Sequence, residues 1–421
     1  MTTTAYDGGG PGATSRPALR RCIRLDPAEF AEQVWARGPL LSTCDQLATE
    51  NPAGFDDLFS LDAVDELLSR RGLRTPFIRL AKGGVVTPAS RYTRPGGTGA
   101  MVGDQVADDR VLELFLDGHT VVFQGLHRLW PPLIEFAGAL TTDLGHPVQV
   151  NAYVTPTQSQ GFSAHYDVHD VFVLQVAGEK RWRIHPPVHD APLRDQPWAD
   201  RRTAVEEQAR SKPVIDTVLR PGDALYLPRG YLHAAEALGG VTCHLTVGVH
   251  PVTRHDVLEA LLDIASDDVA LRTSLPLGAD VGDPAAVEAD VVATVAALTD
   301  RLRTVTAADV ADRLAGSLVS SNRPGPIAPL AQAAAYAELG PDSVLRARPF
   351  QRHVVDTAHD GVILRLGDRT LRLPAATDKA VRALVGGAAL RVADLPGLDP
   401  EEALTLARRL VRESVVVVDG R

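Results

Sequence analysis

The middle of the chain, between about residues 76 and 250, consists of short β-rich runs separated by Gly, Pro and Asp. A single clear helix, near residues 129–145, interrupts them. The runs are TPFIRLA, HTVVFQGL, VQVNAYVTP, DVFVLQVAG, KRWRIHPP, VIDTVLRPGDALYLP and VTCHLTVGVHP. Many short strands with turn residues between them are typical of a sandwich or barrel. The sequence therefore predicts a β core in the middle of the chain.

The segments that flank this β-rich region have different residue patterns. Residues 1–18 are rich in Gly and Thr and are expected to form a disordered tail. Helices are expected to begin after Asp26 and after Ser60, because each precedes an amphipathic run. From 254 to 339, Ala and Leu recur at helical spacing. The last stretch, 355–421, predicts a small α+β tail that includes a hairpin turning at Gly367–Asp368.

Composition excludes several classes of protein. A length of 421 residues favours two or three domains, and a net charge of −10 argues against a broad nucleic-acid surface. The three cysteines form no CxxC pair, so neither a zinc finger nor a disulfide framework is expected, and a reducing cytoplasm is the predicted compartment. The N-terminus has no apolar core, and no run approaches the roughly 18 apolar residues of a membrane helix. No contact with membrane is expected.

The stretch SAHYDVHD places His165 and Asp167 two positions apart, at the start of an extended apolar run. Residues i and i+2 of an extended chain face the same way, so the imidazole and the carboxylate project together. They make two thirds of the two-histidine, one-carboxylate set that holds non-haem Fe(II). The third ligand is expected at His233, because the turn at Pro221–Asp223, the run ALYLP and the break at Pro228–Gly230 aim it inward.

Each part of this pattern has a simpler explanation when taken alone. An HxD dipeptide is common, and a histidine after a strand is ordinary; His185, His189, His244 and His250 lie nearby, and most of these are expected to be surface or structural. The combination of HxD, a turn, a strand and a histidine is what favours a metal site.

Lys180 is one of only four lysines in a chain whose other basic residues are arginine. It follows the apolar run by a few positions, and a buried lysine needs a partner. A small dicarboxylate could chelate the metal at one end and pair with the Lys180 ammonium at the other. By itself, Lys180 is explained more simply as a turn residue after Gly178.

Two segments carry a resemblance to a known family: NAYVTPTQSQGFSAHYDVHDVFVLQVAGEKRWRIHPP and PGDALYLPRGYLHAAEA. They resemble the JmjC-type, cupin-fold 2-oxoglutarate oxygenases, and within these the ribosomal oxygenase branch. The resemblance is strong over about 100 residues, from Asn151 to His250. It implies an α+β fold with a double-stranded β-helix (jelly-roll) core, a helical dimerisation region and a C-terminal winged-helix-like domain. The implied boundaries are 1–18 for the tail, 19–252 for the JmjC/cupin catalytic domain, 253–345 for the helical domain and 346–421 for the winged-helix-like domain.

The resemblance also implies roles for single residues. Iron ligands are expected at His165, Asp167 and His233, and a salt bridge from Lys180 to 2-oxoglutarate. Three further residues match positions that line the cosubstrate and substrate pocket: Asn151, Tyr153 and Thr246. Each of the three has an ordinary structural explanation, as a turn cap, a core aromatic and a good strand former respectively.

Two positions depart from the family pattern. Members that hydroxylate histidine have a serine two positions past the threonine, where this chain has Gly248. Bacterial members that hydroxylate arginine have glycine there, but they use arginine where this chain has Lys180. The pattern is mixed, so the hydroxylated residue, arginine or histidine, stays open.

The expected function is Fe(II)- and 2-oxoglutarate-dependent hydroxylation of an amino-acid side chain in a protein or peptide, with a ribosomal protein as one candidate. A homodimer is expected, and nucleic acid is not an expected partner. One alternative is a cupin metalloenzyme that acts on a small molecule or peptide natural product without 2-oxoglutarate. Another is a ligand-sensing binding module.

Overall fold

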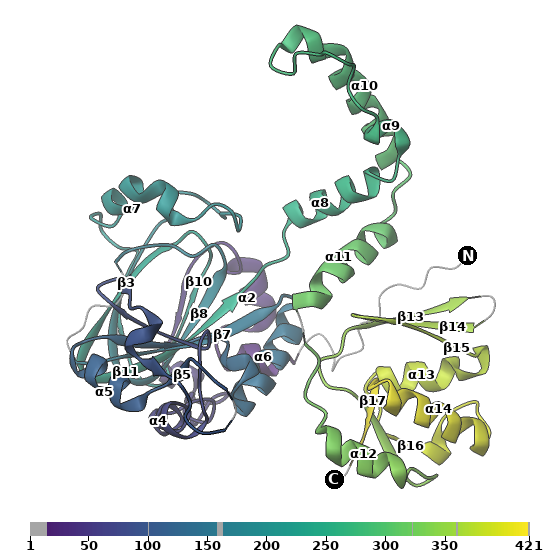
Figure 1. Ribbon diagram of the computed structural model, residues 1–421, viewed down its shortest axis with the longest axis horizontal. Coiled ribbons are helices and arrows are strands. Elements are labelled where there is room, and N and C mark those ends of the chain that lie inside the picture. Colours follow the sequence, from purple (N-terminus) through teal and green to yellow (C-terminus); the bar gives the residue numbers. More distant parts are fainter. Residues whose placement is uncertain (1–14, 100, 158–162, 322, 359–360, 420–421) are drawn as a thin grey trace. The chain divides into compact units, whose positions relative to one another are not determined.

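The computed structural model of the protein divides between Pro251 and Val252 into two compact units, which are described separately. The division falls next to the predicted boundary at 252/253. The predicted boundary at 345/346 is not reflected in it, because the second unit contains both the helical segment and the α+β tail. The structure describes residues 15–99, 101–157, 163–321, 323–358 and 361–419 (Figure 1).

The first unit opens with short helices whose starts were predicted from their caps. The Asp26 carboxylate accepts a hydrogen bond of 2.9 Å from the Ala28 N–H at the start of α2 (Pro27–Gln33). Ser60 Oγ accepts one of 3.2 Å from Ala63 at the start of α4 (Leu61–Arg70). Such caps satisfy N–H groups that have no partner within the helix. The other helices of this unit are α1 (Pro17–Arg20), α3 (Cys44–Leu47), α5 (Asp108–Leu116), α6 (Pro131–Leu144) and α7 (Arg202–Gln208).

The predicted tail lies mostly outside the described residues. Its last two residues, Pro17 and Ala18, belong to α1, where Ala18 is buried.

A nine-stranded antiparallel sheet forms the core of the first unit. Its order is β1-β10-β8-β11-β7-β6-β2-β3, and β9 pairs with β8 as well. Strands distant in the sequence are therefore neighbours, as β8 and β11 are. The strands are β1 (Leu40–Ser42), β2 (Ile78–Lys82), β3 (Val85–Val86), β6 (Thr120–Phe123), β7 (Val148–Thr155), β8 (Asp170–His185), β9 (Ile215–Leu219), β10 (Ala224–Leu227) and β11 (Leu232–Val249), and a small separate pair is formed by β4 (Thr93–Arg94) and β5 (Gln105–Val106).

Strand β8 is one continuous strand where two runs were predicted. Its first half lies between β10 and β11, and its second half lies between β9 and β11. The strand bends at Gly178, whose φ is +64° and where a Cβ would lie 2.5 Å from the Val241 carbonyl oxygen. Only glycine fits there. The Gln175 side-chain amide donates a 3.0 Å hydrogen bond to the Gly178 carbonyl and helps to hold the bend.

A register shift between Gln175 and Ala177, just before the bend, changes which side chains of β8 face the interior of the β core. Odd-numbered residues face inward before it and even-numbered residues after it. Four residues of β8 share one buried cluster: Val171, Val173, Trp182 and Ile184. On the opposite side of the strand, Phe172 packs against Phe30 of α2, with ring centroids 6.2 Å apart.

The second unit begins with the predicted helices. They are α8 (Arg254–Ala265), α9 (Val269–Arg272), α10 (Pro284–Leu302), α11 (Ala307–Ser321) and α12 (Pro329–Ala337). Large apolar side chains on α8 and α10 are exposed, among them Leu258, Leu262 and Val292. None of the described helices combines the length and apolar character needed to span a lipid bilayer.

The α+β tail has its own buried core. The predicted hairpin is formed by β14 (Gly361–Leu366) and β15 (Thr370–Leu373), which pair antiparallel, and β13 (His353–Ala358) completes that sheet. A second sheet contains β16 (Leu390–Arg391), β12 (Val344–Ala347) and β17 (Val416–Val418). Two amphipathic helices, α13 (Asp378–Val385) and α14 (Pro400–Arg412), bury Leu384 and Leu410 in the core.

Candidate active site

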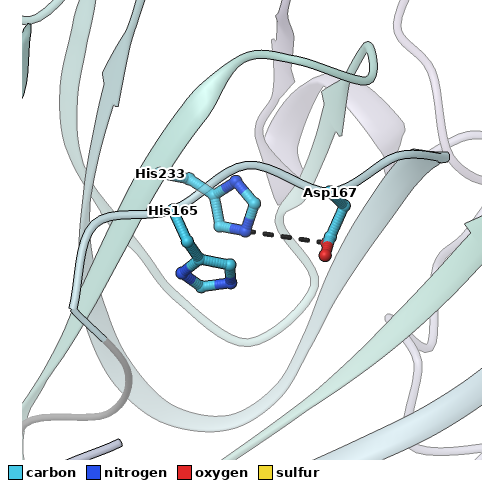
Figure 2. A group of neighbouring side chains, drawn as sticks. All are labelled: His165, Asp167 and His233. Atoms are coloured by element: carbon cyan, nitrogen blue, oxygen red, sulfur yellow. Dashed lines mark ion pairs between the residues drawn. The ribbon is translucent and has the colours of Figure 1, made fainter. Parts of the chain in front are cut away.

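Three predicted ligand residues lie together at one end of the β core (Figure 2). His165 and His233 pair through their backbones: the His233 N–H donates to the His165 carbonyl at 2.8 Å, and the His165 N–H donates to the His233 carbonyl at 3.2 Å. Asp167 is held beside them, because its carbonyl accepts a 3.1 Å hydrogen bond from the Gly230 N–H. One side-chain donor atom from each of His165, Asp167 and His233 lies within 4.8 Å of the others.

The imidazoles are oriented by their own backbone. His165 Nδ1 lies 2.7 Å from the Ser163 carbonyl, and His233 Nδ1 lies 3.2 Å from the Tyr231 carbonyl. A carbonyl can only accept, so each Nδ1 carries the proton and each Nε2 keeps its lone pair. Metal-binding histidines are usually oriented in this way. His233 Nε2 lies 3.8 Å from Asp167 Oδ2.

The electrostatics keep His233 and Asp167 deprotonated. Burial, together with the nearby His165, lowers the pKa of His233 to about 4, so its imidazole is neutral at pH 7. Burial acts to raise the pKa of Asp167, but the surrounding histidines, His233 foremost, outweigh it and hold that pKa below its usual value. Neutral imidazole and ionised carboxylate are the forms that bind a divalent cation. The donor set therefore fits the facial arrangement known for ferrous iron.

Lys180 is buried in the interior, just after the bend in β8, with 3% of its surface exposed. Its Nζ donates to Thr155 Oγ1 at 3.0 Å and to His244 Nδ1 at 3.2 Å. Within the described residues no carboxylate forms an ion pair with it. Burial lowers the pKa of Lys180 to about 7. The interior thus contains a basic nitrogen with neutral partners only, where a carboxylate would be the natural counter-ion.

The pocket-lining residues expected from the resemblance share one face of two paired strands. Asn151 lies opposite Thr246, and Tyr153 lies opposite His244, in the register of β7 and β11. The intervening residues of both strands pack into the main core on the other side. Asn151 Oδ1 also accepts a 3.1 Å hydrogen bond from the Gly125 N–H, so it does serve a turn, as its simpler explanation proposed.

His244 was not identified from the sequence as a neighbour of Tyr153 and Lys180. Its ring is stacked on Tyr153 with centroids 5.1 Å apart and an interplanar angle of 5°. Burial, with the Lys180 charge, lowers the pKa of His244 well below its usual range, so the ring stays neutral and accepts from Lys180. Its spacing of two from Thr246 on one strand was the available signal.

Arg79 is a second residue near the site that the sequence analysis did not identify. It lies on β2 opposite Val122 of β6, and Val122 lies opposite Tyr153 of β7. Burial, together with Asp167, raises the pKa of Tyr153, and the positive charge of Arg79 opposes that rise. At Asp167 the same charge adds to the effect of the histidines, which hold the pKa of that carboxyl below its usual value. An arginine between the buried Ile78 and Leu80 fits a strand with one face toward a polar interior.

Gly248, where the family pattern is mixed, is a place of close packing. A Cβ there would lie 3.0 Å from His169 Cε1 and 3.2 Å from Gln149 Cγ. The His169 ring in turn makes an edge contact with His250, with centroids 5.2 Å apart. The volume that a serine would use is thus filled by neighbouring side chains.

Comparison with known proteins agrees with this arrangement. Residues 136–257 match the family model described as a JmjC domain. Over 156 residues the chain is 37% identical to Ribosomal oxygenase 1 of Rattus norvegicus, covering 35% of this chain and 25% of that protein. Over 241 residues it is 32% identical to the bifunctional lysine-specific demethylase and histidyl-hydroxylase NO66 of Drosophila erecta, covering 54% and 34%. The chain therefore spans about a quarter to a third of the length of these curated relatives.

Among solved structures, the Escherichia coli ribosomal oxygenase YcfD in complex with cobalt and 2-oxoglutarate has a TM-score of 0.53 at 17% identity, covering 95% of this chain and 99% of that one. Another structure of E. coli YcfD has a TM-score of 0.56 at 16% identity. The likeness at this level is one of fold, and it bears out the predicted JmjC/cupin architecture. Residues 136–257 thus match the JmjC domain family, and the chain is similar over part of its length to the ribosomal oxygenases.

Proposed function

We propose that this protein is an Fe(II)- and 2-oxoglutarate-dependent oxygenase that hydroxylates an amino-acid side chain of a protein. The iron ligands are His165, Asp167 and His233, and Lys180 pairs with the far carboxylate of 2-oxoglutarate. The observation that carries the proposal is the buried Lys180 nitrogen, which has only neutral partners and belongs to the same strand system as the three clustered donors. The solved YcfD complex with cobalt and 2-oxoglutarate supports the assignment of the cofactors.

The chain's own residues place and protect the reactants. His165 and His233 present Nε2, because backbone carbonyls occupy their Nδ1 protons, and Asp167 adds one negative charge. Three protein donors on one side leave open positions for the cosubstrate and O₂. When bound, ferrous iron with 2-oxoglutarate and O₂ supplies the oxidation that converts a C–H group into C–OH, with succinate and CO₂ as products. The apolar residues Val171 and Val173 keep the interior dry.

Protonated Lys180 selects a dicarboxylate of the right length, since its Nζ is held by Thr155 and His244 and cannot move freely. Asn151, Tyr153 and Thr246, on the shared face of β7 and β11, are proposed to contact the cosubstrate or the substrate.

The proposed substrate is a protein side chain, arginine or histidine, and a ribosomal protein is the leading candidate. The names of the related ribosomal oxygenases and of the histidyl-hydroxylase support it. The most direct test compares the intact masses of ribosomal proteins from cells with and without the gene. The expected result is the loss of one oxygen atom from one protein.

The reaction class has its own test. Purified protein with Fe(II) and O₂ is expected to convert 2-oxoglutarate to succinate, and His165→Ala is expected to lose at least about 100-fold of this turnover, because an iron ligand is gone. His255→Ala is the matched control, since His255 is an exposed residue of α8. Equal turnover by the wild type and His165→Ala would contradict the proposal.

The proposal extends to assembly and compartment. Exposed Leu258, Leu262 and Val292 on α8 and α10 support a homodimer formed through the helical region 253–345. The remaining part, 346–421, is proposed to be winged-helix-like. Free thiols at all three cysteines fit a reducing cytoplasm. Light scattering that gives a monomeric mass would remove the dimer.

A further inference from the structure

A fully buried carboxylate lies close in sequence to two of the candidate metal ligands. Asp170 is the first residue of β8, three positions after Asp167, and none of its surface is exposed. Its neighbour Val171 faces the interior, so Asp170 faces the opposite side and does not reach the metal donors. Burial of a carboxylate is costly unless hydrogen bonds compensate for it.

The compensation comes from a different segment of the chain. Tyr226 Oη, in β10, donates a 2.7 Å hydrogen bond to Asp170 Oδ2. The Arg229 backbone N–H donates to Oδ1 at 3.0 Å, and the Arg229 guanidinium lies 3.7 Å from the same oxygen. Both Asp170 oxygens are therefore bound to β10 and to the turn that follows it.

These two segments are the ones that carry the proposed ligands. The segment before Asp170 carries His165 and Asp167, and the turn after β10 leads within four residues from Arg229 to His233. The backbone bonds between the segments, described above, join the ligand residues themselves, and Val171 of β8 also pairs with Leu227 of β10. Asp170 adds two strong, charge-assisted contacts that join the same segments from behind.

We propose that Asp170 is a positioning residue that locks the His165–Asp167 segment to the His233 segment, so that the three donors are arranged before the metal arrives. This inference rests on the proposed function, because it assumes that a divalent metal binds there. Preorganisation of this kind reduces the cost of ordering the ligands on binding, and loss of such a supporting contact typically weakens a metal site 10–100-fold.

The chain offers a matched control in Asp223, at the other end of β10. Asp223 is also buried, and its carboxylate accepts hydrogen bonds from the Cys44 N–H at 2.7 Å and the Arg220 N–H at 2.8 Å. Neither partner belongs to a segment that carries a ligand. Asp170→Asn and Asp223→Asn both remove a buried charge, but only the first weakens the connection between the ligand segments.

The test is a titration of the metal-free protein with Co(II) alone, followed by tryptophan fluorescence and by visible absorption. Trp198 lies 6.3 Å from His165 and Trp182 lies 6.1 Å from His233 between ring centroids, so both report on the centre. We expect Asp170→Asn to bind Co(II) 10–100-fold more weakly than wild type and with an altered absorption spectrum. Asp223→Asn is expected to keep the wild-type affinity and spectrum, even if its melting temperature falls.

Tyr226→Phe serves as a second variant should Asp170→Asn fail to fold, because it keeps the ring that packs against Phe30 and Phe172. It removes one of the contacts and is expected to weaken Co(II) binding in the same direction by a smaller factor. Wild-type affinity in Asp170→Asn, or in Tyr226→Phe if only that variant folds, would overturn the inference. So would an equal loss in Asp223→Asn. Failure of the wild type to bind Co(II) would instead overturn the metal centre, and this inference with it.

Discussion

Lys180 and His244, from the neighbouring strands β8 and β11, lie 3.2 Å apart between Nζ and Nδ1, and both side chains are buried. His244 stays neutral because burial and the adjacent Lys180 lower its pKa. A neutral imidazole accepts a hydrogen bond from the ammonium without cancelling its charge. Lys180 therefore remains available for an incoming carboxylate, and its own titration becomes a measurable property of cosubstrate binding.

Affinity for 2-oxoglutarate should fall as the pH rises above about 7. Burial lowers the pKa of Lys180 to about 7, so the empty pocket loses its ammonium above that pH, while the bound dicarboxylate requires the protonated form. Linkage then predicts a loss of up to about tenfold in affinity per pH unit. Calorimetric titration of the Co(II)-loaded protein at pH 6, 7, 8 and 9 measures it. Lys180→Arg, which stays charged throughout, should show a flat profile if it still binds. A flat wild-type profile would contradict the prediction.

Lys180→Met should make the protein more stable while it abolishes 2-oxoglutarate binding. A buried basic group with neutral partners costs stability, and an apolar side chain of similar length removes that cost, by about 1 kcal/mol or more. Because the folded-state pKa is lowered from 10.5 to about 7, the cost grows as the pH falls from 10.5 to 7 and is fully present below 7. The advantage of Met in urea unfolding should thus be larger at pH 6 than at pH 9. A destabilised Lys180→Met variant would show that the lysine contributes to folding.

Gly178→Ala should destabilise the protein much more than Gly239→Ala. Both glycines have positive φ, +64° and +62°, so both substitutions carry the strain of a left-handed backbone. At Gly178 the new Cβ would also lie 2.5 Å from the Val241 carbonyl oxygen, whereas nothing lies within 4 Å at Gly239. We expect about 1 kcal/mol for Gly239→Ala and at least about 2 kcal/mol more for Gly178→Ala, measured by urea unfolding. Equal losses of unfolding free energy in the two variants would mean that the backbone at Gly178 can move to accommodate the new Cβ.

Gly248→Ser should be coupled energetically to His169. The serine Cβ would lie 3.0 Å from His169 Cε1, a contact that forces the imidazole to move. We expect a loss of about 1–3 kcal/mol from Gly248→Ser alone. The loss should be smaller in a His169→Ala background, with a coupling of at least about 0.5 kcal/mol, and Gln149 keeps the rescue partial. A double-mutant cycle in urea measures the coupling, and strict additivity would show that the two residues do not compete for space.

The two-residue spacing of His165 and Asp167, together with the turn residues before His233, was enough to identify the candidate ligands from the sequence. His165 and Asp167 are two apart and were expected at the start of a strand, and the structure places them just before β8, which begins at Asp170. The break at Pro228–Gly230 was expected to turn His233 toward them. The structure does bring these three together, since the two histidines pair through their backbones. Local sequence patterns were sufficient for these three residues, because each candidate ligand lies next to the turn that orients it. Their role in binding metal stays a prediction.

The residues that were missed depend on which strands become neighbours. His244 acts on Lys180 only because β11 pairs with β8, and Arg79 reaches Tyr153 only because β6 joins β2 to β7. Asp170 is similar, since its partners are more than 50 positions away. Strand order is a property of the whole sheet, and a single sequence carries no local signal for it.

The irregularity in β8 also determines which of three consecutive charged side chains points into the interior. Glu179, Lys180 and Arg181 are consecutive; Glu179 pairs with Arg220 and Arg181 with Asp216 at the surface, and only the middle residue goes inside. The register shift between Gln175 and Ala177 changes the alternation by one, so the position of a residue along the strand determines whether its side chain faces the interior. Deleting Glu179 would move Arg181 to the inward-facing position and turn Lys180 outward, so that the Lys180 contacts with Thr155 and His244 would be lost. Insertions and deletions in this half of the strand should therefore be tolerated only in pairs, and single ones should remove Lys180 from the interior.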